Sequence, residues 1–179
     1  MCSICQRGVK VGKFVFAFTF ACSLLVPLIS LAATLQGTVV GIQDGDTITV
    51  LDAAKTTHKI RLSGIDAPEK NQPFGNASKQ ALSDMVYERT VTIEYEKNDR
   101  YGRKVGKVLV NGVDANLVQV KAGLAWHYKK YEKEQPREES LEYGRAEVRA
   151  REAGLGLWKD AQAVPPWDWR KRGKQAGEQ

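Results

Sequence analysis

Cysteine is nearly absent from this chain, and its few occurrences are confined to one end. The three cysteines are Cys2, Cys5 and Cys22, and none occurs after that point. The rest of the chain therefore lacks disulfide bonds and thiolate metal ligands, so its hydrophobic core must stabilise it unaided. Only two histidines, His58 and His127, are present. With no cysteine beside them, they argue against a zinc centre.

Other common signatures are missing as well. The glycines do not gather into a phosphate-cradling loop, which argues against an enzyme driven by nucleotide hydrolysis. We find no Ser–His–acid signature and no internal repeat. The 179 residues, 42% hydrophobic and 27% charged, are typical of an ordinary globular protein with one domain.

The N-terminal residues resemble a targeting segment. An uncharged run over residues 14–33 follows three basic residues, Arg7, Lys10 and Lys13. This pattern and the small residues at its end predict a signal peptide over residues 1–33, cleaved after about Ala32 or Ala33. We therefore expect an exported protein, periplasmic or secreted. The alternative is an uncleaved anchor, because a run of this length could span a bilayer, and only then would the protein be membrane-bound.

The charge of the chain favours an anionic partner. The net charge is +6 and the isoelectric point is about 9.2. Three of these charges belong to the predicted leader, so the remaining chain is only mildly basic.

Five stretches that alternate or are rich in strand-forming residues predict short β-strands, over residues 35–42, 46–51, 57–62, 90–96 and 105–110. Three helices are expected, over residues 77–87 with Asn76 as N-cap, 115–121 with Asp114 as N-cap, and 136–153. We predict an α+β, β-rich fold: a five-stranded OB-fold barrel with three packed helices, over residues 34–160. Residues 161–179 form a tail rich in proline, tryptophan and basic residues, expected to grade into a disordered end.

Three carboxylates provide the main chemical signal. Asp46 follows a hairpin-type Asp-Gly pair, whereas Asp66 and Glu69 flank Pro68, which stiffens the loop between them. A hard divalent cation needs several oxygen ligands from different loops, and calcium tolerates a mixture of carboxylate, carbonyl and water. Each segment by itself could be an ordinary polar turn.

Two arginines complete the candidate site. Arg61 ends the third predicted strand, and Arg103 follows a charged loop. Guanidinium groups are permanently protonated and present a planar fork to phosphate oxygens, which suits a five-coordinate phosphorus. Glu69 is then the candidate for activating water.

Taken together, five segments resemble the staphylococcal nuclease (thermonuclease) family in order and spacing. They are IQDGDT at 42–47, RLSGIDAPE at 61–69, NDRYGR at 98–103, AGLA at 122–125 and LW at 157–158. The resemblance covers nearly all of the chain after the leader. It implies an OB barrel and a calcium-dependent nuclease that cleaves DNA and RNA with little sequence specificity, leaving 3′-phosphorylated products.

The resemblance also assigns roles to residues. It implies that calcium is bound by Asp46, Asp66, the backbone carbonyl of Ala67 and, through water, Glu69. It implies that Arg61 and Arg103 bind phosphate with Glu69 as general base. The positions near the substrate would be Arg100, Tyr101, Tyr128 and Tyr131, the last two as base-stacking tyrosines that match less directly.

Two departures from the family pattern bear on the substrate. Ala67 stands where the best-known member has threonine, and the loop over residues 70–75 is shorter. The alternative function is a nucleic-acid-binding OB module without catalysis, but the acids and both arginines are present. We expect a monomer that acts on DNA and RNA without an obligate protein partner.

Overall fold

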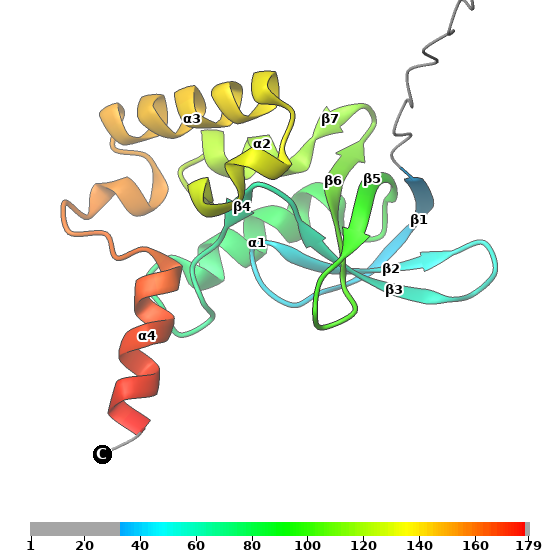
Figure 1. Cartoon of the computed structure of the whole chain (residues 1–179), viewed down its shortest axis with the longest axis horizontal. Coiled ribbons are helices and arrows are strands. Elements are labelled where there is room, and N and C mark those ends of the chain that lie inside the picture. The colour runs from blue at the N-terminus through cyan, green and yellow to red at the C-terminus, as the bar shows by residue number, and fades with distance from the viewer. Residues whose placement is uncertain (1–32, 178–179) are drawn as a thin grey trace, which may run out of the picture. The chain divides into compact units, whose positions relative to one another are not determined.

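The barrel strands coincide with the alternating stretches of the sequence. The structure, a computed structural model, describes residues 33–177, except for the side chains of residues 174, 176 and 177. Its five main strands are β1 (Ala33–Ile42), β2 (Thr47–Asp52), β3 (Thr57–Leu62), β5 (Thr90–Asn98) and β6 (Lys104–Val110) (Figure 1). β1 pairs antiparallel with β2 and β5, β2 pairs with β3, and β5 pairs with β6. A parallel pairing of β3 with β6 closes the barrel, which confirms the predicted architecture.

Three very short strands were not predicted. β4 (Ile65–Asp66) pairs with β8 (Trp126–His127), and β7 (Val113–Asp114) pairs with β6. Two-residue strands are too short to show a periodic pattern, so the sequence gives no signal for them. The β4–β8 pairing matters because it attaches the loop after β3 to the segment after the second helix.

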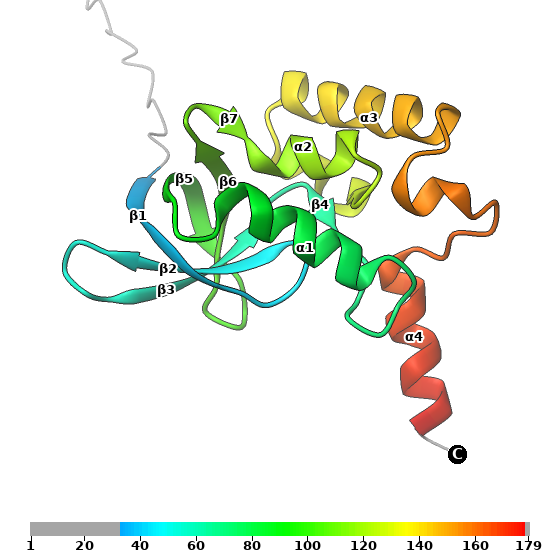
Figure 2. The ribbon, with the colours of Figure 1, turned by 180° about the vertical axis from the view of Figure 1, so that it is seen from behind.

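The three predicted helices are present. They are α1 (Gly75–Val86), α2 (Ala115–Lys121) and α3 (Arg137–Glu152). Figure 2 shows α1 crossing in front of the barrel strands and α2 running beneath α3. Two 3-10 helices, η1 (Lys129–Glu134) and η2 (Gly156–Lys159), lie on either side of α3 in the sequence.

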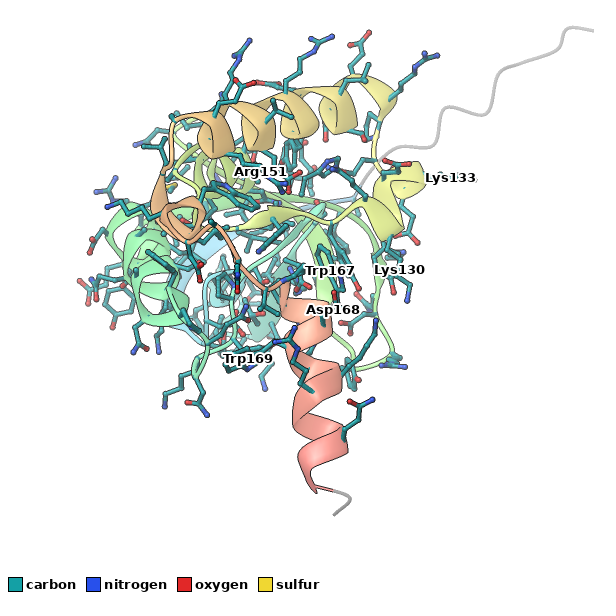
Figure 3. All side chains as sticks on the ribbon, turned by 90° about the vertical axis from the view of Figure 1, so that its left-hand side faces the viewer. Lys130, Lys133, Arg151, Trp167, Asp168 and Trp169 are labelled. Carbon is teal, nitrogen blue, oxygen red and sulfur yellow. The ribbon has the colours of Figure 1, made fainter. Side chains whose placement is uncertain are left out.

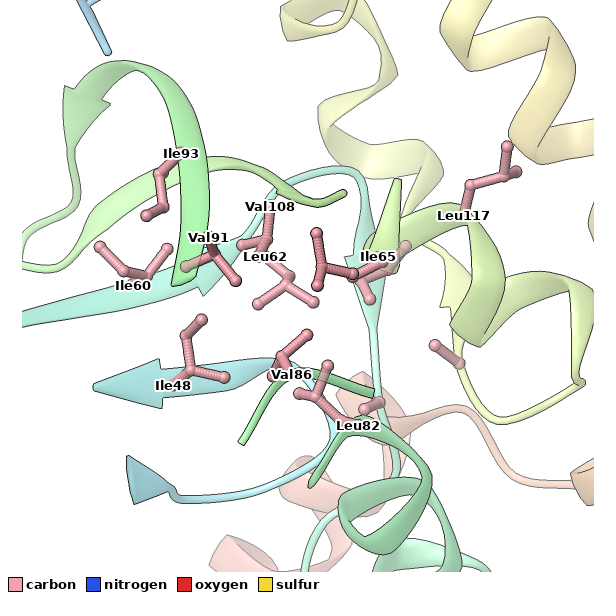
Figure 4. Close-up of a cluster of buried hydrophobic side chains, with 14 of the residues drawn as sticks. Ile48, Ile60, Leu62, Ile65, Leu82, Val86, Val91, Ile93, Val108 and Leu117 are labelled. Atoms are coloured by element: carbon pink, nitrogen blue, oxygen red, sulfur yellow. The ribbon is translucent and has the colours of Figure 1, made fainter. Parts of the chain in front are cut away.

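One core joins the barrel to its helices. Inward-facing residues of the strands are fully buried, among them Ile48, Ile60, Leu62 and Ile93. Figure 4 shows these side chains meeting the α1 side chains Leu82 and Val86. Burial of this continuous apolar surface is the main contribution to stability in a chain without disulfides.

The N-terminal cap was predicted correctly for α2 but not for α1. Asp114 caps α2 as expected, since its carboxylate accepts a hydrogen bond from the backbone N–H of Leu117 at 3.0 Å. Asn76 does not cap α1. The helix starts at Gly75, and its N-cap is Phe74, in a left-handed conformation with φ 66°. A backbone turn, in which Gly75 N–H donates to the Gln72 carbonyl, leads directly into the helix and makes a side-chain cap unnecessary.

The C-terminal tail is helical where we expected increasing disorder. α4 spans Pro166–Gly177 and belongs to the same compact unit as the barrel. Its last turns extend away from the barrel (Figure 1). Aromatic and ionic contacts of its first turns, described below, hold this polar segment in place. The predicted leader, apart from Ala33, lies outside the described residues. Within residues 33–177 no helix combines the length and apolarity needed to cross a membrane.

Candidate active site

Asp46 is fixed at the start of β2 by its own turn. Its backbone N–H donates to the Asp44 carboxylate at 3.0 Å, and its carbonyl accepts a hydrogen bond from Leu62 N–H at 2.8 Å. The hydroxyl of Thr47 donates to Asp46 Oδ1 at 3.0 Å. The side chain is only 7% exposed, so its direction is determined by these contacts.

The turn also depends on a glycine and on α2. A Cβ atom at Gly45 would lie 1.9 Å from the Ser78 hydroxyl oxygen, so only glycine allows α1 to approach this closely. Gln119 of α2 donates from Nε2 to the carbonyls of Gly45 and Ser78, each at 2.9 Å. Gln119 is fully buried, which makes α2 an internal support for the Asp46 turn.

Asp66 and Ala67 are held against Asp46 by the short β4 strand. Asp66 pairs with Trp126 across the β4–β8 ladder, and both Asp66 and Ala67 are buried. The backbone N–H of Ala67 donates to Asp46 Oδ2 at 2.6 Å. Two carboxylates from separate segments therefore meet in one buried place.

Arg61 lies between the two buried carboxylates. Its Nη2 atom is 3.1 Å from Asp46 Oδ2 and 2.9 Å from Asp66 Oδ1, and Nη1 donates to the carbonyl of Leu62 at 2.8 Å. The guanidinium compensates part of the buried negative charge.

Glu69 is the more accessible carboxylate, and its partner is a residue that the sequence analysis missed. Arg170 of α4 places Nη1 2.6 Å from Glu69 Oε1 and Nη2 2.7 Å from Asp66 Oδ2, with Nη1 also 3.3 Å from Asp66 Oδ1. Burial alone would lower the pKa of Arg170, but the hydrogen bonds to Asp66 and Glu69 outweigh it and raise the pKa. The only sequence signal for this contact was the aromatic-basic composition of the tail, which does not identify a partner.

Asp46 has an unusual titration for a carboxyl group. Burial raises its pKa to about 7, the charges of Asp44 and Asp66 raise it as well, and Arg61 opposes them. A cation bound beside this carboxylate would stabilise its charged form and so lower its pKa.

Arg103 lies just before β6 and is held by its own loop. Its Nε atom is 2.7 Å from Asp99 Oδ2, and its guanidinium lies 5.5 Å from the Tyr101 ring centre. Although burial would raise the pKa of Asp99, the hydrogen bonds from Arg103 lower it. The described residues show no contact of Arg103 with the buried acids, but the parallel β3–β6 register sets Arg61 opposite Val105, two residues beyond Arg103.

The other predicted substrate residues divide into two groups. In the loop before β6, Arg100 lies over the ring of Tyr101, 4.9 Å from its centre, and Tyr101 is 69% exposed. Near the acids, Tyr128 and Tyr131 meet edge to face with ring centres 5.0 Å apart. Burial and then the charge of Asp66 raise the pKa of Tyr128, consistent with its place beside the acids.

The tail also meets these aromatics. Trp167 stacks on Tyr128 at 5.3 Å with nearly parallel rings, and it borders a cavity of about 390 Å³ that Lys130 and Arg151 also line (Figure 3). His127, which precedes Tyr128 in the sequence, is buried, and its Nε2 lies 3.2 Å from Gln135 Oε1.

The donor chemistry at the acids fits a hard cation. Asp46, Asp66 and Glu69 supply carboxylate oxygens from two segments, and the Ala67 carbonyl is adjacent in sequence. Within residues 33–177, no three acidic or histidine side chains are already arranged around one ion position. The guanidinium groups of Arg61 and Arg170 lie on these carboxylates instead. The residues therefore fit calcium by type. A calcium ion at these carboxylates would have to displace the guanidinium groups of Arg61 and Arg170 from them.

The fold and the site define a class: a closed OB barrel that brings carboxylates and arginines together in a largely buried cluster, a combination suited to a metal ion and a phosphate. Comparison with known proteins makes this specific. The family described as "Staphylococcal nuclease homologue" matches residues 59–160. The chain belongs to the staphylococcal nuclease family.

Several curated bacterial proteins are similar over most of their length. An "Uncharacterized endonuclease" of Escherichia coli O157:H7 is 43% identical over 143 residues, which cover 79% of this chain and 89% of the relative. A "Micrococcal nuclease" of Shigella flexneri is 37% identical over 166 residues, covering 87% of this chain and 92% of the relative. The plant "Staphylococcal-like nuclease CAN1" of Arabidopsis thaliana is 40% identical over 113 residues, covering 63% of this chain and 33% of the relative.

Proposed function

We propose that this protein is a calcium-dependent nuclease that hydrolyses phosphodiester bonds of DNA and RNA with little sequence specificity. The observation that carries the proposal is the convergence of Asp46, Asp66 and Arg61 in one buried cluster with Glu69 at its edge. Membership of the staphylococcal nuclease family and the names of the bacterial relatives support it.

The proposed metal ligands are Asp46, Asp66, the carbonyl of Ala67 and, through water, Glu69. Bound calcium supplies positive charge that neutralises the phosphate under attack. Asp46 and Asp66 are buried and held by several hydrogen bonds, so their carboxylates are already ordered. The guanidinium groups of Arg61 and Arg170 that contact them would have to move aside for the ion.

Glu69 is the proposed general base. Its side chain is 38% exposed, so water can reach it, whereas Asp46 and Asp66 are buried. In the proposed reaction Glu69 accepts a proton from water, and the water oxygen forms a bond to phosphorus. The bond from phosphorus to the 5′ oxygen breaks, and its electron pair leaves on that oxygen, which takes up a proton from solvent. The phosphate stays on the 3′ end of the product.

Arg61 and Arg103 are proposed to donate hydrogen bonds to the non-bridging phosphate oxygens. Negative charge on these oxygens grows in the five-coordinate transition state, so the benefit is largest there. Arg100 and Tyr101 would contact the terminal phosphate of the substrate, while Tyr128 and Tyr131 would stack on bases.

The proposal is tested by degradation of single-stranded DNA, with calcium and with excess chelator, by wild type and Glu69→Gln. The matched control is Glu96→Gln, which changes an exposed glutamate of β5. We expect calcium-dependent cleavage that Glu69→Gln reduces sharply and Glu96→Gln does not. Tight DNA binding without cleavage in either condition would instead support the non-catalytic OB module.

We also propose that the protein is exported and acts as a monomer in the periplasm or outside the cell. The leader pattern over residues 1–33 supports export. N-terminal sequencing of the exported protein should find a start at about Ala33 or Thr34. A start at Met1 in the membrane fraction would point to an uncleaved anchor.

A further inference from the structure

The first turns of α4 contact the acids that we assign to calcium. The guanidinium of Arg170 spans the two carboxylates, 2.7 Å from Asp66 Oδ2 and 2.6 Å from Glu69 Oε1. These are charge-assisted contacts to two different acids at once, the strong kind of hydrogen bond. Arg170 is separated by 101 residues from Glu69 along the chain, so the contact reflects the fold and not local sequence.

The same helix covers a ring that we assign to nucleobase stacking. Trp167 lies on Tyr128 with ring centres 5.3 Å apart and an angle of 11° between the planes. Trp167 also packs edge to face with Trp126, with ring centres 5.7 Å apart. An indole stacked in this way occupies the place that a base would need. Figure 3 shows Trp167 and Asp168 at the end of α4 nearest the barrel.

The segment before α4 is attached to the loop that carries Glu69. Gln72 donates from Nε2 to the carbonyl of Val164 at 2.6 Å, and its Oε1 accepts a hydrogen bond from Glu69 N–H at 3.1 Å. The backbone N–H groups of Asp168 and Trp169 both donate to the carbonyl of Pro165 at 3.0 Å. Gln72 thus ties the segment before α4 to the Glu69 loop, and the Pro165 contacts form the first turn of the helix.

A cation at the acids and Arg170 cannot both be bound well. A calcium ion requires oxygens of Asp66, and a guanidinium 2.7 Å from the same carboxylate would lie within a few ångströms of that ion. Two positive charges at that distance repel strongly in a partly buried place. The Arg170 side chain is 41% exposed, so it can leave the acids for water at moderate cost.

We propose that α4 is a built-in competitor for calcium and nucleic acid, with Arg170 in the place of the cation and Trp167 in the place of a base. This inference rests on the proposed calcium-dependent nuclease. Calcium binding releases Arg170, and release of the helix uncovers Tyr128 for the substrate. Because coupling is reciprocal, closure of α4 weakens calcium binding by the same factor by which calcium weakens closure.

The direct test is calcium binding measured by titration calorimetry on wild type, Arg170→Gln and Arg172→Gln. Arg172 is an exposed residue of the same helix for which the described residues show no ion pair, so its replacement controls for the loss of one positive charge. We expect Arg170→Gln to bind calcium at least about five-fold more tightly, the lower end of ordinary coupling between sites. Arg172→Gln should bind calcium as wild type does.

A second measurement follows the helix itself. Amide hydrogen exchange in α4 should accelerate when calcium is added to wild type. In Arg170→Gln the same amides should exchange fast without calcium, and calcium should add little. Exchange in α4 that calcium leaves unchanged in wild type would overturn the proposal.

The outcomes separate this inference from the function on which it rests. Equal calcium affinity of wild type and Arg170→Gln would overturn the competitor and leave the calcium-dependent nuclease standing. Weaker binding by Arg170→Gln would also overturn it and make Arg170 a supporting residue of the metal site. Absence of calcium binding in all three proteins would overturn both proposals.

Discussion

At the residue scale, the acids and Arg61 form an interdependent set. Asp46 and Asp66 are buried carboxylates brought together by Ala67 N–H and by Arg61, which contacts both. Such an arrangement is costly without positive charge. The guanidinium therefore has two roles, one for the fold in the absence of metal and one for the proposed reaction.

Replacement of Arg61 by glutamine should separate these roles. We expect cleavage to fall by roughly 100- to 1,000-fold, since a donor aimed at developing charge is lost. Arg145→Gln, at an exposed position of α3, is the control. The measurement is the initial rate of cleavage of single-stranded DNA. Circular dichroism shows whether each variant keeps its fold. Near-normal rates in Arg61→Gln would end this assignment.

His127 should make the protein sensitive to mild acid. Burial lowers the pKa of His127 below its ordinary value of 6.5, and Nδ1 has no hydrogen-bond partner among the described residues. Below pH 6.5 the unfolded chain binds a proton at this histidine more readily than the folded protein does. The free energy of unfolding should therefore decrease as the pH falls from 6.5.

The measurement is urea unfolding at pH 7.5 and pH 5.5, in chelator, for wild type and His127→Gln. The variant should lose less stability on acidification than wild type. Equal losses in the two proteins would show that His127 does not contribute to the acid sensitivity.

At the element scale, α2 supports the site from behind. Gln119 holds the carbonyls of Gly45 and Ser78, and Gln119 is completely buried. This helix thereby couples the Asp46 turn to α1. The capping residue Asp114 was recognisable in the sequence, whereas the role of Gln119 was not, because its partners are 74 and 41 residues away.

Gln119→Met should retain the volume of the side chain but remove these donors. We expect the free energy of unfolding to fall by about 1–3 kcal/mol, the usual cost of leaving buried acceptors unpaired. Calcium affinity should fall as well, because the Asp46 turn loses its support. Unfolding in urea and calorimetric titration are the measurements, with the exposed Gln36→Met as control. Unchanged values for both quantities would remove α2 from the account of the site.

The elements also show what the sequence could and could not reveal. The barrel strands and α1–α3 carry periodic patterns, so they were predictable from local chemistry. The Phe74 cap is a left-handed backbone turn without a side-chain signal, and the strands β4 and β8 depend on contacts between distant segments. In the tail, polar composition suggested disorder, whereas Trp167 and Arg170 find partners that only the folded barrel provides. The acids were predictable by type, but their pairing with Arg170 was not.

At the scale of the whole molecule, calcium should stabilise the fold. A ligand that binds only the folded state at about 100 times its dissociation constant adds about 2.7 kcal/mol. For a chain of this size, that corresponds to a rise in Tm of about 5–10 °C. Differential scanning calorimetry with calcium and with chelator measures it. Asp66→Asn should show little or no shift, and a full shift in that variant would place the metal elsewhere.

The parallel pairing of β3 with β6 has a consequence for the order of events during folding. Arg61 and Arg103 come from opposite sides of this closure, with Ile60 opposite Lys104 and Arg61 opposite Val105. Hairpins such as β2–β3 form from neighbouring residues, whereas this pairing must close a long loop, which is entropically slow. Arg103 therefore reaches the strand that carries Arg61 only when this closure has formed. Newly made molecules should therefore gain cleavage activity later than they gain most of their secondary structure.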